Sequence, residues 1–150
     1  MTPAVEAAKR AGIEFQLHEY EGVEVGDGDY ALAVAAAVGR PPAQLFKTLV
    51  ASVDGNLAVF VVPADRQLDL RAAGKRAALA GKAEAERATG YVVGGISPLG
   101  QRRQLPTTVD ASVLEWDTVL VSAGRRGLQL ELAPHDLVRL TGAQLKDVAR

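Results

Sequence analysis

The stretch FKTLVASVDGNLAVFVVP, residues 46–63, predicts a β-hairpin at the centre of the fold. Two runs rich in β-branched residues, 46–53 and 57–62, flank Asp54-Gly55-Asn56. Turn residues between two such runs are a strong short-range signal for a pair of antiparallel strands. We therefore expect a β-sheet that begins with this hairpin.

The segments on either side add strands and helices without a regular βαβ alternation. Further strands are expected at residues 14–20, 118–123 and 128–132, and the last two enclose Gly124-Arg125-Arg126-Gly127 as a second hairpin. This mixture predicts a single α+β domain, residues 1–150, with a mixed β-sheet core surrounded by short helices. The expected helices are residues 3–11, 30–38, 69–80, 83–88, 135–140 and 143–148.

Composition excludes several classes of function. The 150 residues carry a formal net charge of −1 and no cysteine. The lack of cysteine excludes a disulfide framework, a zinc finger and a cysteine nucleophile supplied by the protein. The near-neutral charge gives no global field, so RNA contacts must come from local basic clusters, and neither a membrane nor DNA is an expected partner. No apolar run is long enough for a signal peptide or a membrane span, which fits a cytoplasmic protein.

Motifs for metal or cofactor chemistry are weak. The two histidines, His18 and His135, stand far apart and have no partners at metal-ligand spacing. Gly26-Asp27-Gly28 resembles a dinucleotide-binding loop only faintly, because no clear strand precedes it and Asp27 would repel a phosphate. We therefore expect neither a metal nor an organic cofactor.

Lys47 is the first candidate functional side chain. Strand alternation places it on the same face as Leu49, Ala51 and Val53. A lysine on an apolar face is uncommon. It is either a cation at the mouth of a pocket or a long side chain that carries its ammonium out to water.

The loop at residues 94–106 is the second candidate. Three glycines fall within its first seven residues and allow a ligand to approach the main chain closely. Exposed N–H groups there could bind a carbonyl oxygen or a phosphate, although the loop could equally be a plain connection. Gly95-Ile96-Ser97-Pro98 resembles a serine-hydrolase elbow. That elbow uses the N–H after the serine, and Pro98 has none, so Ser97 is not expected to be an elbow nucleophile.

Basic pairs are the candidate contacts for a polyanion. Any one of them could be a solvated surface pair, but two lie in glycine-bounded loops near the suspected pocket, where they could contact phosphates. The pairs are Lys75-Arg76, Arg102-Arg103 and Arg125-Arg126.

Seven segments spread over nearly the whole chain match one known pattern. They are TPA at 2–4, HEY at 18–20, FKTLV at 46–50, VP at 62–63, LDL at 68–70, TGYVVGGISPLGQRRQLP at 89–106 and SAGRRGLQLEL at 122–132. With them the chain resembles the YbaK/EbsC family of aminoacyl-tRNA deacylases, and it looks closest to the Cys-specific branch.

The resemblance implies a trans-editing hydrolase that deacylates mischarged Cys-tRNA(Pro). It also implies substrate-assisted catalysis, in which the thiol of the cysteine attacks its own carbonyl and the protein supplies no nucleophile. An Ala-tRNA(Pro) deacylase of the same family and a non-catalytic module that binds tRNA or a synthetase remain the alternatives. Prolyl-tRNA synthetase is an expected partner besides the acceptor end of the tRNA.

The resemblance also assigns roles to residues. Lys47 corresponds to a pocket lysine that positions the substrate near the 3′ end of the tRNA, and the glycine loop would present N–H groups to the ester carbonyl. Tyr30 stands where the Cys-specific branch has phenylalanine. Gln129 stands where close relatives often have aspartate, and an amide carries no charge. The implied catalytic set is Lys47, Thr48, Gly94, Gly95, Ser97 and Gly100, the substrate-binding set Tyr20, Tyr30, Ser122, Gly124 and Gln129, and the tRNA-binding set Arg102, Arg103, Arg125 and Arg126.

Overall fold

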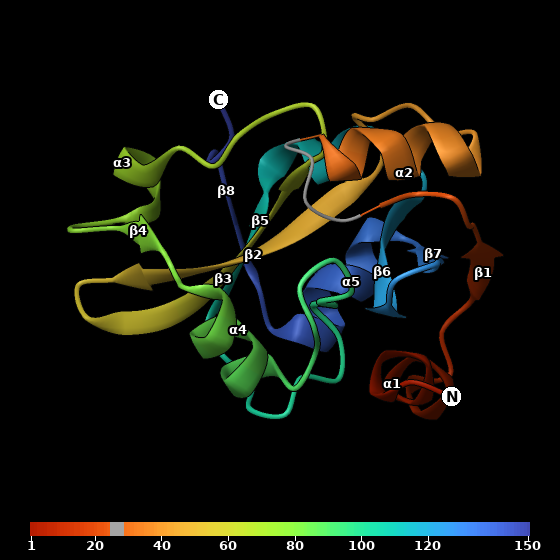
Figure 1. Ribbon diagram of the computed structural model, residues 1–150, viewed down its shortest axis with the longest axis horizontal. Coiled ribbons are helices and arrows are strands. Elements are labelled where there is room, and N and C mark those ends of the chain that lie inside the picture. Colours follow the sequence, from red (N-terminus) through yellow and green to blue (C-terminus); the bar gives the residue numbers. More distant parts are fainter. Residues whose placement is uncertain (25–28) are drawn as a thin grey trace.

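The computed structural model describes residues 1–24 and 29–150 (Figure 1). Its elements alternate irregularly between helix and strand, as expected for the α+β class. In chain order they are α1 (Pro3–Ala11), β1 (Phe15–Glu19), α2 (Tyr30–Val38), β2 (Phe46–Val53), β3 (Asn56–Pro63), α3 (Leu70–Ala73), β4 (Ala78–Leu79), α4 (Lys82–Thr89), β5 (Thr107–Asp110), the 3₁₀ turn η1 (Ala111–Glu115), β6 (Val119–Arg125), β7 (Leu128–Leu132), α5 (Pro134–Thr141) and β8 (Gln144–Lys146).

The strands form two sheets that meet in the middle of the molecule. A five-stranded mixed sheet has the order β4-β2-β3-β5-β8, and a three-stranded antiparallel sheet has the order β1-β7-β6. Strands β2 and β6 lie against each other, and a parallel bridge joins Leu45 to Leu120. Figure 1 shows β1, β6 and β7 at one end and the tip of the β2–β3 hairpin at the other. The expected single α+β domain with a mixed sheet is confirmed.

The central hairpin has the register that its turn residues dictate. Val53 pairs with Asn56, so the turn consists of Asp54 and Gly55 alone. Both have positive φ, +50° and +86°. Positive φ at both positions is typical of a type I′ turn, whose twist matches that of the flanking strands. Asn56 therefore opens β3 instead of belonging to the loop.

The first helix has the boundaries that its capping residues predict. The Thr2 hydroxyl accepts a hydrogen bond from the Val5 N–H, Pro3 occupies the first helical position, and Gly12 ends the helix with φ +70°. Tyr30–Val38 and the residues before Gly90 are also helical as expected.

The expected helix over residues 69–80 is wrong, because only Leu70–Ala73 is helical. Gly74 ends it with φ +147°, and a methyl group there would lie 2.5 Å from the Val53 side chain. The chain then turns back along the hairpin, and residues 78–79 pair with β2 as a short edge strand. An alanine-rich composition favours a helix locally, but contact with the sheet decides otherwise.

The prediction for the C-terminal segment is also wrong. Residues 143–148 were expected to be helical, but Gln144–Lys146 is a strand that pairs in parallel with β5. The carboxylate of Asp110 accepts hydrogen bonds from the N–H groups of Val148 and Ala149, at 2.9 and 3.0 Å, and fixes the end of the chain. Strand β5 itself was not predicted, since four residues after a proline give too short a pattern.

The helices of the described part of the chain are all too short or too polar to cross a lipid bilayer. Residues 26–28, which were discarded as a dinucleotide-binding loop, lie outside the described residues.

Candidate active site

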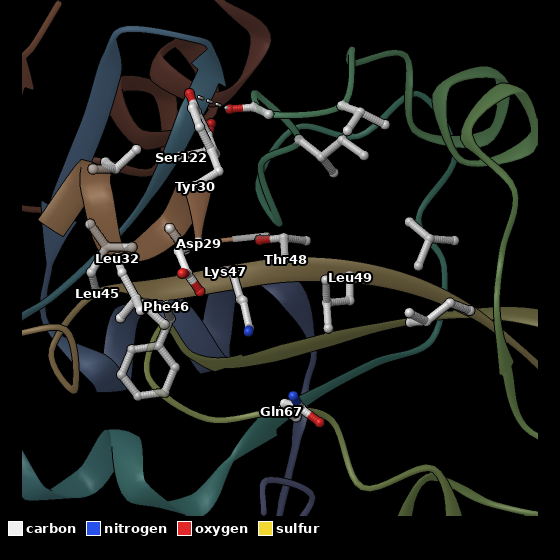
Figure 2. Close-up of a pocket in the computed structure, with 18 of the residues that line it drawn as sticks. Asp29, Tyr30, Leu32, Leu45, Phe46, Lys47, Thr48, Leu49, Gln67 and Ser122 are labelled. Atoms are coloured by element: carbon white, nitrogen blue, oxygen red, sulfur yellow. Dashed lines mark hydrogen bonds between the residues drawn. The ribbon is translucent and has the colours of Figure 1, made fainter. Parts of the chain in front are cut away.

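A cavity of about 500 Å³ opens where β2, β6, β7, α2 and the glycine loop meet (Figure 2). Six of the expected site residues contribute to its lining, from five separate segments of the chain. They are Tyr30, Lys47, Thr48, Gly94, Ser122 and Gln129.

Lys47 lies on β2 opposite Val62 and lines the cavity with a half-buried side chain. Burial lowers the pKa of its ammonium, and the nearby carboxylates of Asp65 and Asp29 oppose that shift by stabilising the charge. Figure 2 shows Asp29 beside Lys47 on the same side of β2. The geometry suits a cation held at a pocket wall, although its catalytic role stays a prediction.

Two buried polar atoms in the lining have no hydrogen-bond partner among the described residues. They are the Thr48 hydroxyl oxygen and the Gln129 side-chain carbonyl oxygen. An unpaired buried group costs about 1–3 kcal/mol, so proteins pair nearly all of them. These two oxygens therefore have unused hydrogen-bonding capacity at residues that line the cavity.

Tyr30, the first residue of α2, connects Tyr20 to the loop at residues 94–106. The hydroxyl groups of Tyr20 and Tyr30 lie 3.0 Å apart. Tyr30 donates to the Gly94 carbonyl at 3.4 Å (Figure 2). Burial and the contact with Tyr20 raise the pKa of Tyr30, so its phenol stays protonated and can donate at neutral pH. Tyr20 itself is outside the cavity lining.

The other expected glycines do not face the cavity but sit against the protein's own chain. A methyl group at Gly95 would lie 2.8 Å from the Arg125 backbone, one at Gly100 2.6 Å from the Pro3 carbonyl, and one at Gly124 2.8 Å from the Tyr91 ring. These glycines let the loop press between the β6–β7 hairpin and α1. Gly94, with φ +91°, is the glycine of the predicted set that lines the cavity.

Ser97 is fully buried away from the cavity. Its hydroxyl oxygen accepts a hydrogen bond from the Leu99 N–H at 3.2 Å. This placement agrees with the argument that Pro98 leaves no serine-hydrolase elbow. The hydroxyl of Ser122 does line the cavity, and it accepts from the Gly124 N–H at 3.2 Å.

The histidines lie elsewhere. His18 binds Glu131 at 2.7 Å on the small sheet, and His135 is exposed on α5. No group of three or more metal-binding side chains was found among residues 1–24 and 29–150.

The four arginines of the predicted tRNA-binding set are all exposed, but they are not equivalent. Arg126 donates from Nε and Nη2 to the Val93 carbonyl, at 3.0 and 2.8 Å. Arg125 donates to the Arg126 carbonyl within the same hairpin. Arg102 packs over Gly90.

Sequence reasoning missed residues that line or support the site. Asp29 and Asp65 face Lys47, and the position of Asp65 just after the end of β3 was a signal that the hairpin register could have given. Glu86 on α4 accepts a hydrogen bond from the Val93 N–H at 2.8 Å. No local pattern marks that contact, because its partner is a backbone group seven residues away.

Known proteins resemble this chain in architecture and in sequence. Residues 27–140 match the model of the aminoacyl-tRNA editing domain. EbsC of Enterococcus faecalis, whose name provisionally assigns it Cys-tRNA(Pro)/Cys-tRNA(Cys) deacylase activity, is 35% identical over 87% of this chain and 83% of its own. The multifunctional Ser/Thr-tRNA deacylase ProXp-y of Escherichia coli is 29% identical over 93% of this chain and 86% of its own.

A solved structure, described provisionally as a trans-editing enzyme for prolyl-tRNA synthetase, superposes with a TM-score of 0.84. It is 26% identical, and the match covers 100% of this chain and 99% of that one. The match to the family model and the 35% identity extend over most of the chain. The chain therefore belongs to the family of aminoacyl-tRNA editing domains and is an aminoacyl-tRNA deacylase of the YbaK/EbsC type.

Proposed function

We propose that the chain deacylates Cys-tRNA(Pro) in trans, after prolyl-tRNA synthetase has attached the wrong amino acid. The observation that carries the proposal is the chemistry of the cavity. The hydroxyl groups in its lining, on Tyr30, Thr48 and Ser122, have no histidine or carboxylate hydrogen-bonded to them within the described ranges. A hydroxyl needs an adjacent base to become a nucleophile, and none of the three is hydrogen-bonded to a basic side chain among the described residues, Lys47 included.

In the proposed mechanism the substrate supplies the nucleophile. The cysteine Sγ forms a bond to its own carbonyl carbon, the ester bond to the terminal ribose breaks, and the ribose oxygen takes up the proton of the thiol. Water then opens the cyclic thiolactone to free cysteine. Holding the thiol against the carbonyl supplies several kcal/mol, on the order of 7–11 in the best-oriented intramolecular reactions.

The cavity contributes position and charge. Lys47 places the aminoacyl end of the tRNA, and the free oxygens of Thr48 and Gln129 accept hydrogen bonds from the substrate, including its α-ammonium group. The Gly94 N–H donates to the carbonyl oxygen as it becomes negative, a contact worth roughly 3 kcal/mol. The acceptor-end phosphates are contacted by the exposed side chains of Arg102, Arg103 and Arg125.

The test is a deacylation panel with Cys-, Ser- and Ala-tRNA(Pro). The Cys substrate should react fastest, and its rate should rise with pH as the thiol, with an unperturbed pKa of about 8.5, ionises. The Ser substrate should be much slower because a hydroxyl is the weaker nucleophile, and the Ala substrate should be slowest. Trapping of the thiolactone would distinguish this route from direct attack by water.

Equal rates with Ala- and Cys-tRNA(Pro) would refute the thiol mechanism and favour alanine editing. A faster reaction with Ser-tRNA(Pro) would instead place the chain with ProXp-y in specificity. Binding of all three substrates without hydrolysis would make it a non-catalytic module.

A further inference from the structure

We propose that Arg126 and Glu86 are positioning residues, which together hold the glycine loop so that the Gly94 N–H points into the cavity. The inference rests on the proposed function of that N–H. It assigns Arg126 to the loop instead of to the tRNA backbone.

The polar backbone groups around Gly94 are held from several sides. The Val93 N–H donates to the Glu86 carboxylate at 2.8 Å, and the Val93 carbonyl accepts two hydrogen bonds from Arg126. The Gly94 carbonyl accepts from Tyr30, and the Gly95 N–H donates to the Val92 carbonyl at 2.8 Å. The Gly94 N–H takes part in none of the hydrogen bonds between described residues, which leaves it free for a ligand.

The planar geometry of the peptide bond relates these contacts to the direction of the Gly94 N–H. In a trans peptide the C=O of one residue and the N–H of the next lie in one plane and point in opposite directions. Arg126 therefore sets the direction of the Gly94 N–H when it binds the Val93 carbonyl. Val93 and Gly94 both belong to the cavity lining and Arg126 does not. In this proposal the Gly94 N–H, which points away from Arg126, lies on the cavity side.

The hairpin that carries Arg126 is itself fixed to the loop. The backbone of Arg125 lies so close to Gly95 that a methyl group there would approach it to 2.8 Å. Arg126 also lies close enough to Tyr30 for its charge to oppose the rise in the pKa of that phenol. Two charge-assisted hydrogen bonds from one guanidinium restrict the Val93 peptide more strongly than neutral contacts would.

The experiment separates rate from binding. We would measure single-turnover deacylation of Cys-tRNA(Pro) with increasing enzyme, for the wild type and for Arg126→Ala, Arg126→Lys, Glu86→Ala and Glu86→Gln. Removal of an oxyanion donor itself costs about 10²–10³ in rate, so loss of its support in Arg126→Ala should cost about 10-fold or more. The half-saturating enzyme concentration should change by less than about twofold.

The conservative variants should differ in how much of the rate they recover. Arg126→Lys recovers only part of the rate because an ammonium cannot reproduce the planar fork on the carbonyl. Glu86→Gln retains an acceptor for the Val93 N–H and should recover more rate than Glu86→Ala. The matched controls are Arg71→Ala and Glu84→Gln, exposed residues on α3 and α4 that should leave the rate unchanged.

A second measurement does not depend on activity. In ¹⁵N-edited NMR spectra, Arg126→Ala should shift the Gly94 amide signal and speed its hydrogen exchange, and Arg71→Ala should not. An unchanged Gly94 amide overturns the positioning role whatever the enzyme hydrolyses. So does a wild-type saturating rate in Arg126→Ala combined with weaker, less salt-dependent tRNA binding, which would make Arg126 a phosphate contact. An inactive wild type with a perturbed Gly94 amide would instead refute only the proposed function.

Discussion

Acid should weaken the fold through one buried carboxylate, Glu131 on β7. It is 7% exposed and binds three side chains from different segments. Arg40 donates to both of its oxygens, at 2.8 and 3.0 Å, His18 lies at 2.7 Å, and Thr118 donates from its hydroxyl. Burial alone would raise the pKa of Glu131, but the hydrogen bonds from Arg40, Thr118 and His18 outweigh it and lower the pKa to about 2.

The direction of the effect follows from the depressed pKa. A carboxyl whose pKa is lower in the folded state binds more protons when unfolded, so its contribution is complete above the unfolded value and is lost as the pH falls. The pKa of Glu131 falls by about 2.5, from 4.5 to about 2, on folding. At about 1.4 kcal/mol per unit this is about 3 kcal/mol in total, of which about 2 kcal/mol is lost by pH 3.

The assay is urea unfolding of the wild type and Glu131→Gln at several pH values between 7 and 3. At pH 7 the variant should be less stable by about 3 kcal/mol or more, because it leaves the Arg40 charge unpaired. At pH 3 the difference should shrink to about 1 kcal/mol. Glu19→Gln, which removes an exposed carboxylate from β1, is the control. A difference that stays constant across this range would refute the role of Glu131.

Two further predictions concern activity. Lys47→Ala should reduce deacylation by at least about 100-fold with little change in melting temperature, because a half-buried charge contributes little to stability and serves the substrate in the proposed mechanism. Lys47→Met, which keeps the apolar stem, should lose as much activity. Full activity in either variant would contradict the assigned role. Changing Arg102 and Arg103 together to alanine should weaken tRNA binding and reduce the slope of log Kd against log salt by up to about 0.9 per lost phosphate contact; a slope equal to that of Arg71→Ala would place the RNA surface elsewhere.

The sequence predicts those parts of the fold whose information is local. Asp54-Gly55 specifies a turn that needs positive φ twice, and Thr2, Pro3 and Gly12 specify both ends of a helix. The expected helices at 69–80 and 143–148 failed where distant contacts decide. Gly74 is forced against Val53, and the chain end is held by Asp110, neither of which a window of neighbouring residues contains.

The candidate site, too, could be predicted only where the information is local. Alternation along β2 places Lys47 beside Leu49, and both line the cavity, but it does not predict that Thr48 between them lines it too. Glu86 and Arg126 could not be assigned to the loop in this way, because each binds a backbone group of Val93. A backbone N–H or carbonyl has no residue type, so the sequence carries no sign of which side chain will reach it.

The glycines of residues 94–100 do mark a closely packed loop, but the group that packs against it differs from the one expected. Clustered glycines were expected to let a ligand approach the main chain, but Gly95 and Gly100 let the protein's own backbone approach the loop. A loop pressed between a hairpin and a helix is ordered before the substrate arrives. A donor fixed in advance costs no reorganisation when the oxyanion forms, which is the condition under which backbone N–H groups stabilise transition states most. In the proposed mechanism, the packing at Gly95 and Gly100 holds the neighbouring Gly94 N–H ready for the oxyanion. A chain without cysteine, and with both histidines outside the cavity lining, would then support ester hydrolysis without a nucleophile of its own.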